Sequence, residues 1–225
     1  TDTHHHGCPD VTPVVASLGW AAPDGGRRSE PKGNDMHPTE QLSTILPAVS
    51  SLVDRIQVLQ MNDPTPCDNF TVHGVLDHMM VLGGTFSYWF RGEDAPQLDP
   101  PGVYGWVPAD EFREVMDDLL DAVTSPGAME RIIDSPVGAM SGDQFARFVA
   151  FDGLVHGWDL AVATGQHFEL PSTVVAAVDE FSRQALTDEM RDGDTFKDAV
   201  EVGSDAGPIE RVAAFSGRAV EAPIG

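Results

Sequence analysis

The feature that most constrains the fold is a run of apolar residues spaced three and four positions apart, which starts soon after Met36. Its members are Leu42, Ile45, Leu46, Val49, Leu52, Val53, Ile56 and Leu59. An α-helix turns once in about 3.6 residues, so this spacing puts all of them on one face of a helix. Such a face has to be buried against other elements, which makes a packed helical domain the expected fold.

Pro47 lies within this stripe and predicts a kink or a restarted first turn, because proline lacks the backbone N–H that a helix interior uses. Residues 62–66 (Asn-Asp-Pro-Thr-Pro) predict the end of the helix. A second helix is expected from Thr71, a suitable N-cap, to about Phe90. A third has its apolar stripe at Phe112, Val115, Met116, Leu119 and Val123.

The remaining segments alternate between short and long elements. Residues 129–140 are too short and too interrupted for a helix, so they predict a short extended pair or an irregular crossing. A fourth helix is expected over 142–164, with Gly165 as its stop. A fifth is expected to begin after Pro171 and to run toward Met190.

Four principal helices with connections of mixed length predict an all-α fold. We expect a four-helix bundle with a short extended segment, extra C-terminal helices that include a turn near 208–215, and an irregular N-terminal extension. The extension comprises residues 1–35, which lack a helical or strand period, and the bundle domain comprises residues 36–225. His4, His5, His6 and Cys8 in the extension offer metal-binding groups, although a solvent-exposed tail explains them equally simply.

The charge balance excludes several classes of partner. The chain has 13 Lys and Arg against 36 Asp and Glu, a formal net charge of −23, and its isoelectric point is near 4.3. Such a polyanion is repelled by nucleic acid and by anionic membrane surfaces, so neither is an expected partner. Because no apolar run approaches the roughly 18 residues of a membrane span and no secretory signal is visible, we expect a cytoplasmic protein.

Two of the expected helices carry polar residues on faces that should be buried. On the second helix, His78 follows Val75 by three positions and precedes Leu82 by four, so it shares their inward face. On the fourth helix, Asp152 and His156 stand at i and i+4 on the apolar stripe. The sequence therefore predicts that these three polar side chains point into the bundle.

A divalent metal ion explains this arrangement, because a buried carboxylate without a partner is costly. His78, Asp152 and His156 offer two nitrogens and one oxygen, which suit Zn²⁺ and leave its fourth position open, as in catalytic zinc sites. Nickel or cobalt would fit the same ligands. The alternatives are a hydrogen-bonded core histidine and an Asp–His hydrogen bond within one helix.

Smaller expectations concern residues near this site. Asp159, three residues after His156, is expected either to orient that imidazole or to be a surface carboxylate or a loop contact. Trp158 points away from the site, which favours packing in the core or at an interface. Tyr104 and Trp106 either rim a pocket or anchor their loop.

The local sequences resemble one known group of proteins. The matching segments are, in chain order, 66–72 (PCDNFTV) with Leu76 and His78, 135–138 (SPVG) with Met140, 151–161 (FDGLVHGWDLA), 163–166 (ATGQ) and 208–218 (PIERVAAFSGR). These segments resemble the DinB/YfiT-like superfamily, and particularly its mycothiol-dependent maleylpyruvate isomerase-like branch. The resemblance covers roughly residues 36–218.

This resemblance implies a DinB-type bundle with one divalent metal ion, whose ligands carry over to His78, Asp152 and His156. It also implies mycothiol as a thiol cosubstrate. The chain departs from the isomerase at two points. Asp152 stands where the isomerase has a longer Glu, and only about 60 residues follow Thr164 where the isomerase has a separate C-terminal domain. We therefore do not extend the resemblance to maleylpyruvate as the substrate.

Three classes of function remain open at this point. The first is a metal-dependent, and by preference zinc-dependent, thiol S-transferase or isomerase that uses mycothiol on a small electrophile. The second is a non-catalytic metal-binding or stress-response protein. The third is an accessory subunit that contacts a protein partner through residues 1–35. The sequence leaves open the oligomeric state and whether the protein is an enzyme.

Overall fold

A computed structural model describes residues 36–68, 70–96, 109–135, 138–191 and 196–220. The extension of residues 1–35, with His4, His5, His6 and Cys8, lies outside the described residues, as do Tyr104 and Trp106. The expectations for these residues therefore stay predictions.

Six α-helices, two short 3₁₀ turns and one pair of strands make up the described chain. Their bounds are α2 Pro38–Val53, η1 Val58–Gln60, α3 Val72–Arg91, α4 Ala109–Thr124, β1 Ile132–Ser135, β2 Gly138–Ser141, α5 Gly142–Thr164, α6 Ser172–Ala185, η2 Asp188–Met190 and α7 Pro208–Phe215. The predicted all-α class is confirmed. The expected extended pair at 129–140 is confirmed as an antiparallel hairpin, in which Ile132 pairs with Ser141.

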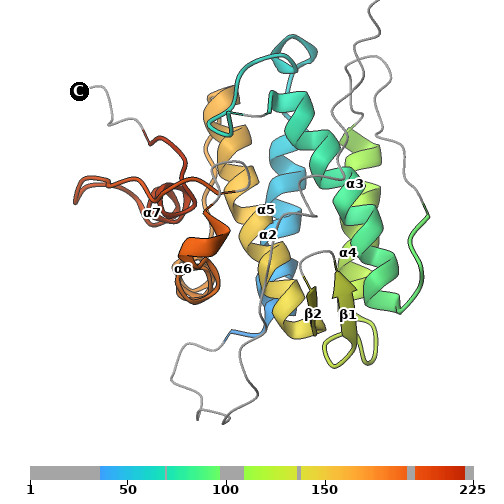
Figure 1. The fold of residues 1–225 in the computed structure, drawn as a ribbon. Coiled ribbons are helices and arrows are strands. Elements are labelled where there is room, and N and C mark those ends of the chain that lie inside the picture. Colours follow the sequence, from blue (N-terminus) through green and yellow to red (C-terminus); the bar gives the residue numbers. More distant parts are fainter. Residues whose placement is uncertain (1–35, 69, 97–108, 136–137, 192–195, 221–225) are drawn as a thin grey trace, which may run out of the picture.

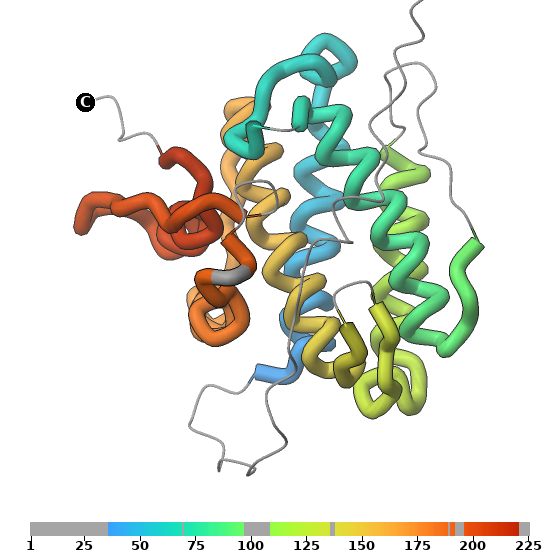
Figure 2. Tube along the Cα trace, in the orientation of Figure 1, coloured from blue at the N-terminus to red at the C-terminus, as the bar shows by residue number. Residues whose placement is uncertain are grey.

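The four long helices pack side by side, and α6 and α7 lie on the outer side of α5 (Figure 1). Within the bundle, α3 packs on α4, and α2 packs on both α4 and α5. The course of the chain in Figure 2 shows that the orange and red C-terminal segments stay on the side of α5 that faces away from α4. Helix α5 thus has neighbours on opposite sides, and its residues are buried almost all the way round.

The first predicted helix differs from the structure at its end. Helix α2 continues through Pro47, so the helix does not restart there, and the expected kink stays a prediction. The helix ends at Val53, and Ile56 is buried in the turn that follows. Leu59 is 89% exposed, so its assignment to the buried stripe was wrong.

The other helix boundaries were predicted from capping and turn residues. The predicted cap at Thr71 and stop at Gly165 are confirmed, and Gly165 adopts the left-handed conformation that glycine allows without strain. Helix α6 ends at Ala185, and Met190 belongs to η2, so the predicted continuation of the fifth helix was too long. Among the described residues, no helix combines the length and the apolar character that crossing a bilayer requires.

Candidate metal centre

The three candidate ligands come from two neighbouring helices whose first turns are held by side-chain caps. The Thr71 hydroxyl accepts a hydrogen bond from a backbone N–H of α3, and Ser141 forms a capping box at the start of α5. From these starts, His78 on α3 is brought to Asp152 and His156 on α5. The structure thus brings together the three residues that the sequence singled out.

The distances from Asp152 to the two imidazoles are close to those of a metal site. One ligand atom each from His78, Asp152 and His156 lies within 4.8 Å of the other two. Asp152 Oδ1 is 3.6 Å from His78 Nε2 and 3.4 Å from His156 Nε2. In a tetrahedral zinc site, bonds of about 2.0–2.1 Å place neighbouring ligand atoms roughly 3.3 Å apart. The carboxylate therefore lies at nearly the required distance from both imidazoles.

An unsatisfied nitrogen supports the fit of these residues to a metal ion. His78 Nε2 is buried and has no hydrogen-bond partner, and the nearby carboxylate oxygen is beyond hydrogen-bond distance. A buried polar atom without a partner is costly, so it calls for an explanation. Two imidazole nitrogens and a carboxylate oxygen are a donor set that Zn²⁺, Ni²⁺ and Co²⁺ bind. A divalent cation would satisfy this nitrogen and the carboxylate together.

The site is closed on one side and open on another. The Phe70 ring lies 5.3 Å from the His78 ring and 6.2 Å from the His156 ring, between centroids. His78 and His156 are 11% and 6% exposed, whereas the Asp152 side chain is 38% exposed. The helix pattern predicted a buried carboxylate at Asp152, and the structure corrects this. A ligand can therefore approach from the side of Asp152.

Asp159 orients the imidazole of His156. Its Oδ2 atom lies 3.0 Å from His156 Nδ1, and its side chain is fully buried, which excludes a surface carboxylate. A proton held on Nδ1 by this contact leaves Nε2 as the nitrogen that would bind a metal ion beside Asp152. The contact thus supports the geometry that a metal ligand needs.

Arg218 is a member of the site that the residue patterns did not reveal. It follows α7, and its Nη2 atom donates a hydrogen bond to Asp159 Oδ2 at 3.1 Å. Burial lowers the pKa of Arg218, but the charge of Asp159 outweighs burial and raises it above its ordinary value. The Asp159 carboxylate thus bridges Arg218 and His156. Membership of the matching segment 208–218 was the only sequence signal for this arginine.

The charges at the site favour a protonated imidazole when no metal is bound. Burial raises the pKa of Asp152, but the charge of His156 and the contacts with both imidazoles outweigh burial and lower it well below its usual range. Burial lowers the pKa of His156, but Asp152 and then Asp159 raise it to about 9. At neutral pH the metal-free site therefore holds an imidazolium between two carboxylates.

Comparisons with known proteins give the following similarities. No family model matches the chain. Two uncharacterized proteins of Mycobacterium tuberculosis, MT0763 and Rv0738, are each 27% identical over 174 residues, which is 77% of this chain and 93% of theirs. A crystal structure of the mycothiol-dependent maleylpyruvate isomerase is 15% identical, with a TM-score of 0.48, and covers 64% of this chain and 68% of its own.

Proposed function

We propose that the protein is a metal-dependent thiol transferase or isomerase, with zinc as the metal and mycothiol as the thiol cosubstrate for a small electrophile. The observation that carries the proposal is the three-residue cluster of His78, Asp152 and His156, in which Asp152 is the most exposed side chain. Three protein ligands with one open position are typical of catalytic zinc sites, whereas structural zinc sites use four.

The proposal assigns a role to each of the three candidate ligands and to the two residues that support them. His78 and His156 provide neutral nitrogen ligands, and Asp152 provides the negative charge that partly balances the cation. Asp159 holds His156 in the required tautomer, and Arg218 balances the buried charge of Asp159. When bound, a divalent cation lowers the pKa of a thiol at the open position and favours the thiolate.

The choice of mycothiol rests on the sequence resemblance, and above all on residues 151–161, which contain two of the proposed ligands. Asp152 is shorter than the Glu of the isomerase, so helix α5 would lie at a different distance from the metal than the corresponding helix of the isomerase does. We therefore propose a small electrophile other than maleylpyruvate.

Metal content is the first test. Protein purified without added metal should contain about one divalent ion per chain, because the described residues offer one such cluster. The variant His78→Ala should lose this ion. His73→Ala is a matched control, since His73 lies on the same helix but pairs with Asp77 outside the cluster. Full metal content in His78→Ala would overturn the site.

Thiol consumption is the second test. The metal-loaded protein should consume mycothiol in the presence of an electrophile from a panel of epoxides, alkyl halides and α,β-unsaturated acids. Removal of the metal should abolish the consumption. Stoichiometric metal without thiol consumption would instead support the non-catalytic metal-binding function.

A further inference from the structure

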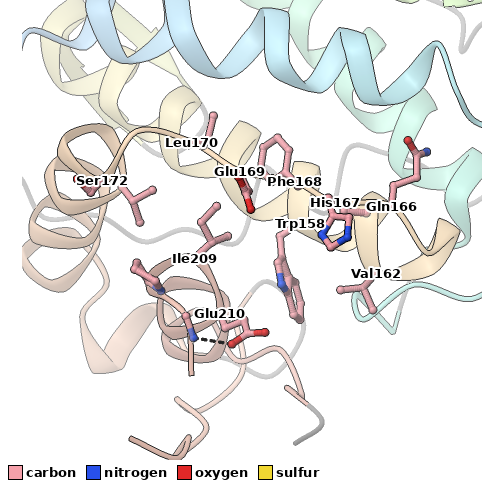
Figure 3. A pocket seen from close by; sticks show the side chains of 14 residues that line it. Trp158, Val162, Gln166, His167, Phe168, Glu169, Leu170, Ser172, Ile209 and Glu210 are labelled. Atoms are coloured by element: carbon pink, nitrogen blue, oxygen red, sulfur yellow. Dashed lines mark hydrogen bonds between the residues drawn. The ribbon is translucent and has the colours of Figure 1, made fainter. Parts of the chain in front are cut away.

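A cavity lies on the side of α5 opposite to the candidate metal centre. Trp158 is two residues from His156, so it points about 200° around the helix from that ligand. There a cavity of about 460 Å³ opens between the end of α5, the connection 166–170 and the first turns of α6 and α7 (Figure 3). This volume is in the range of small-molecule sites.

The cavity is walled by aromatic side chains. Trp158 is only 8% exposed and lines the cavity. Figure 3 shows the Trp158 indole in the cavity wall between Glu210 and His167. Phe168 adds a second ring to the wall. Aromatic faces at a cavity wall favour a ligand with an apolar or aromatic body.

Two carboxylates give the cavity a negative charge. Glu169 and Glu210 both line it, and none of the described residues that line it is a Lys or an Arg. One oxygen of Glu210 accepts a hydrogen bond from the Gly207 N–H at 2.6 Å, which fixes this carboxylate at the cavity. Within the described part of the chain, neither carboxylate pairs with a cationic side chain. The uncompensated charge favours a cation here.

We propose that this cavity binds a small organic cation with an apolar or aromatic body, of the amine or quaternary ammonium class. The rings of Trp158 and Phe168 would contact the body and the charge through packing and cation–π attraction. Glu169 and Glu210 would balance the positive charge. The site is separate from the metal centre, so it does not depend on the proposed thiol chemistry.

The test follows the indole N–H signals by NMR during a titration with benzyltrimethylammonium. The chain has four tryptophans, and the variant Trp158→Phe identifies the signal of Trp158 by its loss. We expect a saturable shift of this signal at millimolar concentrations, unchanged after the metal has been removed with a chelator. Uncharged benzyl alcohol should bind at least threefold more weakly, and added NaCl should weaken only the cation.

Charge variants complete the test. Glu210→Gln keeps an oxygen for the Gly207 N–H and should raise the dissociation constant about three- to fivefold. If Glu210→Gln does not fold, Glu169→Gln replaces it, with the same expected rise in the dissociation constant. Glu180→Gln, an exposed change elsewhere on α6, is the matched control and should have no such effect. Equal binding of benzyl alcohol, or no shift of the Trp158 signal, would overturn the proposal.

Discussion

At the scale of single residues, the two ring nitrogens of His156 contact different carboxylates. Nδ1 contacts the fully buried Asp159, and Nε2 faces the accessible Asp152. The Asp159 carboxylate is thus held by two protein groups, His156 and Arg218. The Asp152 carboxylate is more exposed and can bind a ligand. This difference predicts unequal effects when each carboxylate is neutralised.

We expect Asp152→Asn to weaken metal binding about 100-fold, on the scale of a lost charge-assisted contact. Asp159→Asn should weaken it only about tenfold, because the amide oxygen still accepts the hydrogen bond from His156. Titration with a competing chelator measures both affinities. Equal affinities of Asp152→Asn and the unaltered protein would remove Asp152 from the ligand set.

Metal binding should also release a proton. The pKa of His156 is raised to about 9, so below that pH the imidazole carries a proton that a metal has to displace. Affinity should therefore rise with pH, by about tenfold per unit, until it levels off near pH 9. Calorimetry at pH 7.5 in buffers of different ionisation enthalpy counts the protons. Identical heats in all buffers would show that His156 is already neutral.

At the scale of elements, the start of α5 sets the position of two of the three candidate ligands. Helix α5 follows the β1–β2 hairpin directly, and Gly142 is its first residue. A Cβ atom placed on Gly142 would lie 1.9 Å from the Ala128 carbonyl oxygen, which belongs to the backbone and cannot turn aside. A side chain at this position would therefore push the helix start away from the hairpin.

We expect Gly142→Ala to lower the free energy of unfolding by about 1–3 kcal/mol, the usual cost of overpacking. Gly153→Ala is the matched control within the same helix. Its Cβ would meet the ends of two side chains, Ile45 at 3.2 Å and Leu46 at 3.9 Å, rather than backbone, and alanine favours the helix. Denaturation in urea compares the two variants. A stable Gly142→Ala protein would mean that α5 can begin without the close approach.

At the scale of the whole molecule, the buried core runs from α2 to α7. It includes the first-helix stripe from Leu42 to Val53 as well as Val212 near the end of the described chain. Among the described residues, this core takes buried side chains from all six α-helices. The division into an extension of residues 1–35 and a bundle domain of residues 36–225 stays a prediction.

A chain that begins at Met36 should therefore fold like the full chain. We expect the same helical circular dichroism and a cooperative melting transition, because the removed segment has no periodic apolar residues to contribute. The metal content of the shortened chain serves as a second readout. Aggregation or loss of cooperative melting would show that the extension belongs to the core.

The fold class and the members of the candidate metal cluster could be predicted from the sequence. Apolar spacing of three and four identified the first and third helices, the Thr71 cap identified the start of the second, and polar residues on faces expected to be buried identified His78, Asp152 and His156. The physical reason is that both depend on the helical period, which residues a few positions apart encode. Helix ends with strong turn residues, such as Gly165, were predictable for the same local reason.

Only the tertiary structure decided which groups meet across long distances in the chain. The contact of Arg218 with Asp159 joins residues that are 59 positions apart, and the cavity at Trp158 forms where three helices meet. The exposure of Leu59 likewise follows from where α2 ends rather than from its spacing. The period of a helix tells which face is buried, but what that face contacts depends on how the whole chain packs.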